Sequence, residues 1–170
     1  MGSEKLVADL AREFPNDTGL NSVWLPLGRA SNELRRNNPG KAIALLESAR
    51  AYELGTGPYG YGYYWPNYVR GEAFLTAHEG EKAAVEYEKI LGHRGVDATS
   101  PLYSLAHLGL GRAFVLQGET TKAKTAYQDF FALWKDADPD IPILKQAKAE
   151  YETLKRKTKG QSFKAETGLC

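Results

Sequence analysis

Gly71–Leu91 reads GEAFLTAHEGEKAAVEYEKIL and Gly111–Phe131 reads GRAFVLQGETTKAKTAYQDFF, and the two stretches align without a gap. Ala83 and Ala123 hold the same place in them, 40 residues apart, and Ala42 precedes Ala83 by 41. A small residue stands twelve positions before each alanine and a large one four positions after it: Ala30, Gly71 and Gly111, then Leu46, Tyr87 and Tyr127. Two packed helices need such a small–large pair where they approach most closely. A unit recurring at this length predicts an all-α protein of stacked helical hairpins.

Composition limits the partners that this chain attracts through charge. Its 170 residues allow one domain with a sizeable core, and 22 basic against 21 acidic side chains leave a net charge of +1. We therefore expect no general attraction to nucleic acid or to an anionic membrane. No apolar run approaches the ~20 residues of a membrane span, and no signal peptide pattern opens the chain. We expect a protein that is cytoplasmic as expressed, and the native compartment is left open.

The order of apolar stretches and turns predicts three hairpins with a flanking helix at each end. The flanking helices are expected over 3–14, with Leu6, Leu10 and Phe14 on one stripe, and over about 142–157. Between them we expect paired helices at about 20–34 with 42–52, 66–75 with 82–91, and 102–116 with 121–134. Residues 1–157 then form the repeat domain. Residues 158–170 lack periodicity, which predicts a tail that is an added extension or a flexible end.

A Gly- and Tyr-rich segment, GTGPYGYGYYW over 55–65, is the clearest loop in the chain. Its first six residues match the G-x-G-x-x-G pattern, but they follow a helix and no strand is expected anywhere in the chain, so dinucleotide binding is not expected. The aromatic side chains have two interpretations. They form a binding surface, or they cover the loop with Trp65 in the core. The residues concerned are Tyr59, Tyr61, Tyr63, Tyr64 and Trp65.

The aligned stretches resemble the tetratricopeptide repeat, whose pattern places small residues at the helix crossing, an aromatic three residues after the first of them, and an alanine in the second helix. The second and third units match this pattern at Gly71, Phe74, Ala83 and Tyr87, and at Leu110, Gly111, Phe114, Gly118, Ala123 and Tyr127. In the first unit Glu33 stands where the aromatic is expected. The usual period is 34 residues, so these units are longer by six or seven. The resemblance implies a right-handed solenoid.

A second resemblance concerns the segments FPND (14–17), YVRGEAF (68–74) and LAHLGLGRAF (105–114), which look like the C-terminal sensor regions of bacterial serine/threonine kinases. No kinase motif is present in the chain. This resemblance implies the sensing or assembly part of a bacterial signalling protein.

In tetratricopeptide arrays the first helix of each hairpin lines a concave groove, and the resemblance implies which residues do so here. They are Trp24, Leu27, Ser31 and Arg35 in the first unit, Trp65, Tyr68, Glu72 and Thr76 in the second, and Leu105, Leu108, Arg112 and Leu116 in the third. This set lacks the Lys, Arg and Asn cluster that holds a peptide carboxylate in chaperone-binding members. We expect a peptide anchored by apolar or aromatic side chains. Arg112 opposite Glu72 is alternatively a structural ion pair.

Chemistry is not expected from this chain. His78, His93 and His107 are scattered over different hairpins, and the single cysteine, Cys170, excludes a multi-cysteine metal site. We predict a module that is not an enzyme, needs no cofactor or metal, and binds a protein or peptide. Two alternatives stay open: a self-association module that forms a homo-oligomer through the aromatic loop or tail, and an engineered repeat scaffold.

Overall fold

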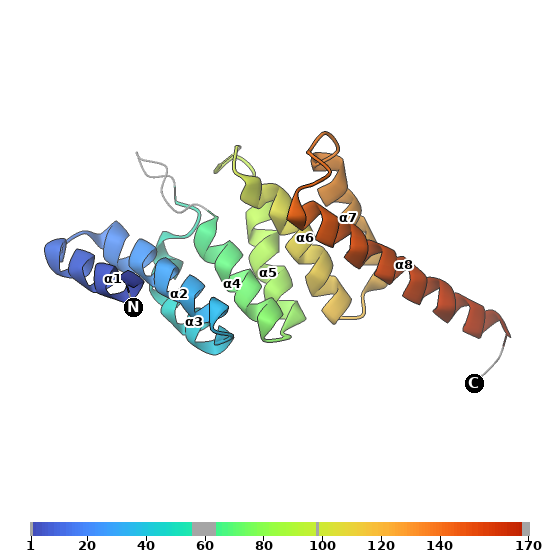
Figure 1. The fold of residues 1–170 in the computed structure, drawn as a ribbon, viewed down its shortest axis with the longest axis horizontal. Helices are drawn as coiled ribbons and strands as arrows, with labels where there is room; N and C mark the ends of the chain where they lie inside the picture. Colours follow the sequence, from blue (N-terminus) through green and yellow to red (C-terminus); the bar gives the residue numbers. More distant parts are fainter. Residues whose placement is uncertain (1, 56–63, 98, 168–170) are drawn as a thin grey trace.

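The structure is a computed structural model that describes residues 2–55, 64–97 and 99–167, with side chains described over 5–55, 64–97 and 99–158. Every regular element in these ranges is a helix, which confirms the all-α prediction. The helices follow one another along the long axis of the molecule, from α1 at one end to α8 at the other (Figure 1). Their bounds are α1 Gly2–Glu13, a π-helical turn Leu20–Trp24, α2 Leu25–Arg35, α3 Pro39–Leu45, a 3-10 helix Glu47–Tyr52, α4 Trp65–Thr76, α5 Gly80–Leu91, α6 Pro101–Leu116, α7 Thr120–Leu133 and α8 Pro142–Thr167.

Three tight turns join α2 to α3, α4 to α5, and α6 to α7 with the same backbone geometry. Asn37, His78 and Gly118 each take a left-handed conformation, with φ of 59°, 59° and 76°. In every turn the next amide donates to the carbonyl five residues back at 2.9 Å, the bond that closes a Schellman helix end. These three positions repeat the spacing of the alanines, so the sequence period marks a recurring hairpin.

The small and large residues of the repeat meet as the spacing predicts. Ala42, Ala83 and Ala123 are completely buried. A methyl group placed on Gly71 would lie 2.7 Å from Cζ of Tyr87, closer than atoms can approach. One on Gly111 would lie 3.0 Å from Cδ2 of Tyr127. The rings thus take the space that the missing side chains leave.

Two helix boundaries differ from the expected ones. The second helix of the first hairpin ends at Leu45 and continues as a 3-10 helix, because the carbonyl of Leu46 accepts from the Ala49 amide and the Arg70 guanidinium. Helix α8 runs to Thr167, past the expected end at residue 157. No proline interrupts that stretch, so nothing in it stops a helix. Its end projects beyond the other helices (Figure 1).

Helix α1 packs only lightly on the rest of the row. Leu6 and Phe14, expected on its apolar stripe, are 60% and 46% exposed, while Leu10 is half-buried. Because α1 lies at the end of the row, one neighbour covers part of its surface and the rest faces solvent (Figure 1).

Candidate functional site

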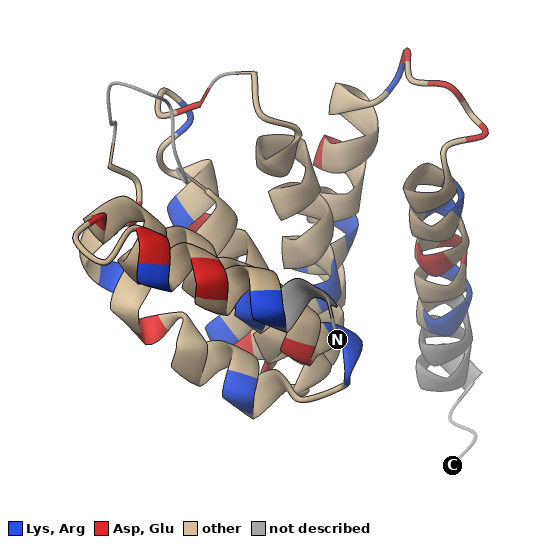
Figure 2. Ribbon diagram, turned by 60° about the vertical axis from the view of Figure 1, so that its left-hand side comes forward, with Lys and Arg blue, Asp and Glu red and all other residues tan. Residues whose placement is uncertain are grey.

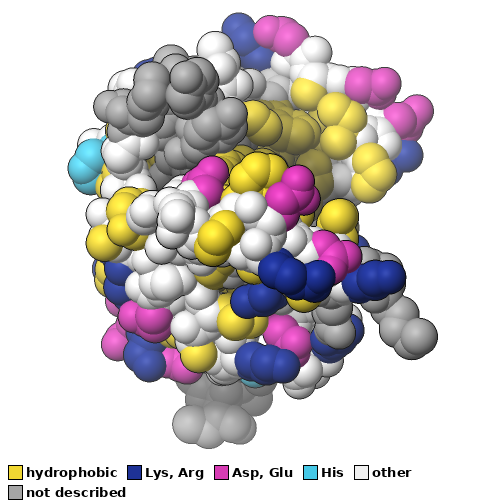
Figure 3. Space-filling model, turned by 90° about the vertical axis from the view of Figure 1, so that its left-hand side faces the viewer, with side chains coloured by type: hydrophobic (Ala, Val, Ile, Leu, Met, Phe, Trp, Pro, Cys, Tyr) yellow, Lys and Arg dark blue, Asp and Glu magenta, His cyan; other side chains and the backbone are white. Residues whose placement is uncertain are grey.

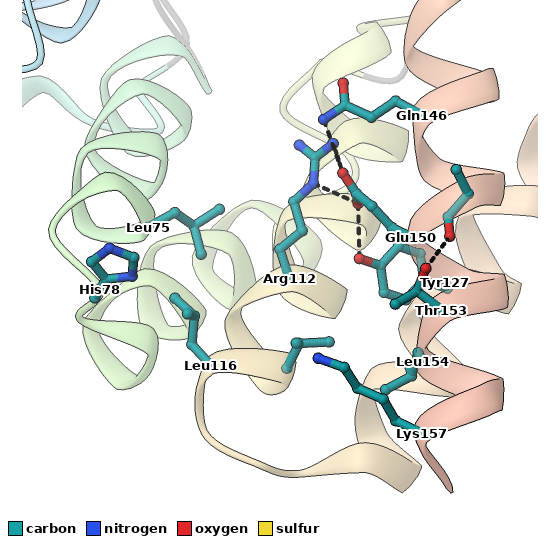
Figure 4. A pocket seen from close by; sticks show the side chains of 12 residues that line it. Leu75, His78, Arg112, Leu116, Tyr127, Gln146, Glu150, Thr153, Leu154 and Lys157 are labelled. Carbon is teal, nitrogen blue, oxygen red and sulfur yellow. Dashed lines mark hydrogen bonds and ion pairs between the residues drawn. The ribbon is translucent and has the colours of Figure 1, made fainter. Parts of the chain in front are cut away.

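A groove of about 650 Å³ lies between α4, α6 and α8, with Tyr127 of α7 contributing to its lining. In the close view, α4 and α8 form the two walls and Arg112 and Leu116 of α6 lie between them (Figure 4). Apolar side chains from all three helices line much of the groove: Leu75, Val115, Leu116, Ala149 and Leu154. Val115 and Leu116 are each 42% exposed, so large apolar side chains face the open space. Exposed apolar clusters of this kind mark interaction sites.

One polar cluster at the centre of the groove is internally satisfied. Arg112 donates to both carboxylate oxygens of Glu150 on α8, at 3.0 and 3.1 Å. Glu150 also accepts from the Tyr127 hydroxyl and the Gln146 amide, each at 2.9 Å. Because these bonds occupy its carboxylate, the cluster holds α8 against α6 and α7. It also leaves Arg112 already paired with a carboxylate.

The alternative that Arg112 forms a structural ion pair with Glu72 is wrong in its partner, because Arg112 pairs with Glu150. Glu72 instead accepts a hydrogen bond from the hydroxyl of Tyr87 at 2.6 Å. Glu72 and Glu150 face one guanidinium between them, and no ion pair joins Glu72 to a basic side chain in the described part of the chain. Glu72 lies beside the groove lining, and the group that it forms with Glu150 and Arg112 carries one carboxylate more than it has cations.

Tyr68 and Tyr87 surround the Glu72 carboxylate with aromatic surface. Their rings meet edge to face, with centroids 6.0 Å apart. Burial raises the pKa of Tyr87 well above its usual value, and the nearby Glu72 carboxylate raises it further. The same two causes raise the pKa of Tyr68.

The second and third units place most of their expected groove residues on accessible surface. On α4, Trp65 is 45% exposed, Tyr68 and Glu72 are half-buried, and Thr76 is exposed. On α6, Leu105 is half-buried, and Arg112 and Leu116 line the groove. Leu108 is 1% exposed and belongs to the core between α6, α7 and α8, so its side chain does not line the groove.

The first unit contributes less. Leu27 is 7% exposed and packs with Ala30 and Leu46 in the core of the first hairpin. The Ser31 hydroxyl donates a hydrogen bond to the carbonyl of Leu27 at 2.9 Å. Trp24 is half-buried and Arg35 is exposed.

The aromatic loop lies mostly outside the described residues, which exclude Tyr59, Tyr61 and Tyr63. Tyr64 is 1% exposed, and its hydroxyl donates to the carbonyl of His93 at 2.8 Å. The burial follows from its place directly before α4, where the ring packs against the second hairpin. Tyr64 is therefore a core residue and not part of an exposed aromatic surface, while Trp65 lies on the surface, as expected of a groove residue and not of a core residue.

A buried ionic cluster joins the first hairpin to the second, and sequence reasoning missed it. Arg70 is completely buried and donates to Glu86 at 2.8 Å, to the Leu46 carbonyl at 3.2 Å, and to Glu53. Asn67, also completely buried, donates to both carboxylates. The sequence did contain one indication of it, because Glu86 lies on the same helix stripe as the buried positions 83 and 90 and so is expected to face the core. The cluster is enclosed, so we assign it to packing between hairpins.

The histidines do not form a site. His107 lies 3.7 Å from a carboxylate oxygen of Asp129 and edge-on to Tyr103, and burial lowers its pKa. Over the part of the chain that the structure describes, no three His, Cys, Asp or Glu side chains gather closely enough to hold a metal ion.

Basic and acidic residues are interspersed over the helices, with no large area of one sign (Figure 2). Viewed from the N-terminal end, hydrophobic side chains line a hollow and acidic side chains lie beside it (Figure 3). No described helix is long and apolar enough to cross a membrane.

Comparison with family models, with curated proteins and with solved structures gave no match for this chain.

Proposed function

We propose that this chain is a non-catalytic binding module that holds a protein or peptide segment in the groove between α4, α6 and α8. The observation that carries the proposal is a groove with accessible apolar walls whose central polar groups are already paired. Arg112, Glu150 and Tyr127 complete one another, which leaves apolar contact as the main interaction offered to a ligand. A groove of this kind suits a segment anchored by apolar or aromatic side chains.

Within this proposal the three hairpins are tetratricopeptide-like units stacked as a right-handed solenoid. The repeated left-handed turn residues and the buried alanines support this arrangement, together with the row of successive helices in Figure 1. The role as a sensing or assembly part of a bacterial signalling protein rests on the sequence resemblance alone.

Selection of peptides from a random displayed library on the immobilised protein tests the function. We expect enriched peptides that share a large apolar residue. A Leu116→Asp variant should lose them, because it places a charge in the apolar part of the groove. Leu116 is 42% exposed, so the fold should tolerate the change.

Val85→Asp is the matched control, since Val85 is an exposed apolar residue of α5 outside the groove lining. It should bind the selected peptides like the wild type. Equal loss in both variants, or no enriched peptide at all, would reject the groove as a binding site.

A further inference from the structure

We propose that the ligand of this groove carries a basic side chain next to its apolar anchor, and that Glu72 binds the basic group. The inference rests on the proposed function and specifies the chemistry of the partner. It follows from the charge balance and the aromatic surface along one stripe of α4.

Trp65, Tyr68 and Glu72 occupy positions i, i+3 and i+7 of α4 and so share one face of the helix. All three are accessible to different degrees, whereas the intervening Asn67, Val69, Arg70 and Gly71 are buried. The stripe therefore presents an exposed indole, a phenol ring and a carboxylate in succession. An ammonium or guanidinium group is attracted both by such rings and by the carboxylate.

The carboxylate of Glu72 has room for this role. It accepts from the Tyr87 hydroxyl at 2.6 Å and interacts with the Tyr68 hydroxyl, but it pairs with no basic side chain among the described residues. Arg112 is near enough to interact with it electrostatically, but its guanidinium is bound through Nε and Nη2 to Glu150. A cation from a ligand would supply a second counter-charge for the two carboxylates. An anionic ligand group would instead meet two carboxylates and a guanidinium already paired with one of them.

The apolar part of the groove begins one helical turn further along α4, at Leu75. Three residues of helix separate it from Glu72, about 4.5 Å along the axis. A ligand spans that distance with one or two residues of extended chain, or with one turn of helix. At the far end of the groove stands Lys157, which would repel a basic group placed there. The ligand should therefore bind with its basic side chain at the Glu72 end of the groove and not at the Lys157 end.

The probes for the test are two synthetic peptide libraries of the same random composition, each with a fixed leucine. One fixes lysine, and the other glutamate, at one or three positions from that leucine. We expect the protein to retain the lysine library in clear preference to the glutamate library. The preference should weaken in high salt, because part of the interaction is exposed to solvent.

A double-mutant cycle on a peptide from the lysine library then locates the contact. Replacing its lysine by glutamine should weaken binding about fivefold to thirtyfold, as expected for a partly exposed ion pair beside aromatic rings. Glu72→Gln should weaken the original peptide equally and leave the glutamine peptide unaffected. Glu88→Gln, an exposed acid on α5, is the control and should change nothing.

The outcomes separate this inference from the function beneath it. If neither library binds, or if binding is insensitive to Leu116→Asp, the groove function fails. If peptides need Leu116 but bind alike with lysine or glutamate, or if Glu72→Gln has no effect, the basic ligand is refuted while the groove stands.

Discussion

Substitution of Gly109 by alanine should destabilise this protein strongly, although alanine is the better helix former. Gly109 of α6 and Gly71 of α4 face the ring of Tyr87 from either side. A methyl group on Gly71 would lie 2.7 Å from Cζ of that ring, and one on Gly109 would lie closer still. The ring is completely buried, so it has no free space into which to move.

The magnitude follows from three contributions. Overpacking a filled site costs about 1–3 kcal/mol. Displacing the ring also weakens the hydrogen bond from the Tyr87 hydroxyl to the Glu72 carboxylate, a contribution of about 1.5–3 kcal/mol for a charged acceptor. The higher helix propensity of alanine offsets about 1 kcal/mol of this loss of stability. The net expectation is a loss of roughly 1.5–5 kcal/mol in the free energy of unfolding.

Urea unfolding followed by circular dichroism measures this loss. Gly28→Ala is the matched control, because Gly28 lies in α2 and a methyl group there meets nothing within 4 Å. That variant should gain up to about 1 kcal/mol. A Gly109→Ala protein as stable as the wild type, with an unchanged denaturant slope, would refute the packing of Tyr87 between two glycines.

Three further changes test other contacts. Glu150→Ala should lower the free energy of unfolding by about 1–3 kcal/mol, because it leaves the half-buried Arg112 without its bidentate partner. Glu152→Ala removes an exposed pair and should change it by no more than about 0.5 kcal/mol. Urea unfolding of both variants measures the difference. Tyr64→Phe removes a buried hydroxyl that is both donor and acceptor and should cost about 1–2 kcal/mol, and an unchanged midpoint of thermal unfolding would contradict the bond. Side-chain hydrogen bonds from neighbouring residues lower the pKa of Glu33 in the folded protein. The contribution of Glu33 to the free energy of unfolding is therefore present above the unfolded pKa near 4.5 and is lost as pH falls through the lower folded pKa. Between pH 6 and 3, the measured free energy of unfolding should fall less in Glu33→Gln than in the wild type.

The repeat spacing was sufficient to predict the hairpins, because the small residue, the turn and the large residue follow one another within one hairpin and recur in all three units. Ala42, Ala83 and Ala123 are buried as that spacing requires. The first unit also shows how a departure from the pattern is accommodated. Glu33 takes the place of the aromatic and is 5% exposed, and it binds Asn38 and Lys41 across the turn.

Two of the predicted groove residues, Arg112 and Leu116, line the groove, but its contacts were not predictable. The residues of α4 came from the resemblance to tetratricopeptide arrays, whereas the partner of Arg112 lies 38 residues away on a helix outside the repeat. No pattern within the repeated units points to Glu150. The same limit applies to Tyr64 and Trp65, since adjacent residues at a helix start point about 100° apart and local periodicity does not decide which of the two faces the core.

The buried Arg70 has a consequence for the order in which this row of helices opens. Its guanidinium takes acceptors from the first hairpin, the Leu46 carbonyl and Glu53, and from the second, Glu86. If the first hairpin unfolded alone, the Arg70 guanidinium would lose its two acceptors there and become open to water, and the hydrogen bonds that link the two hairpins would be lost together. We therefore expect hydrogen exchange to show the first two hairpins opening together and α8 opening before them, and a fragment that begins at α4 to be unstable without its predecessor.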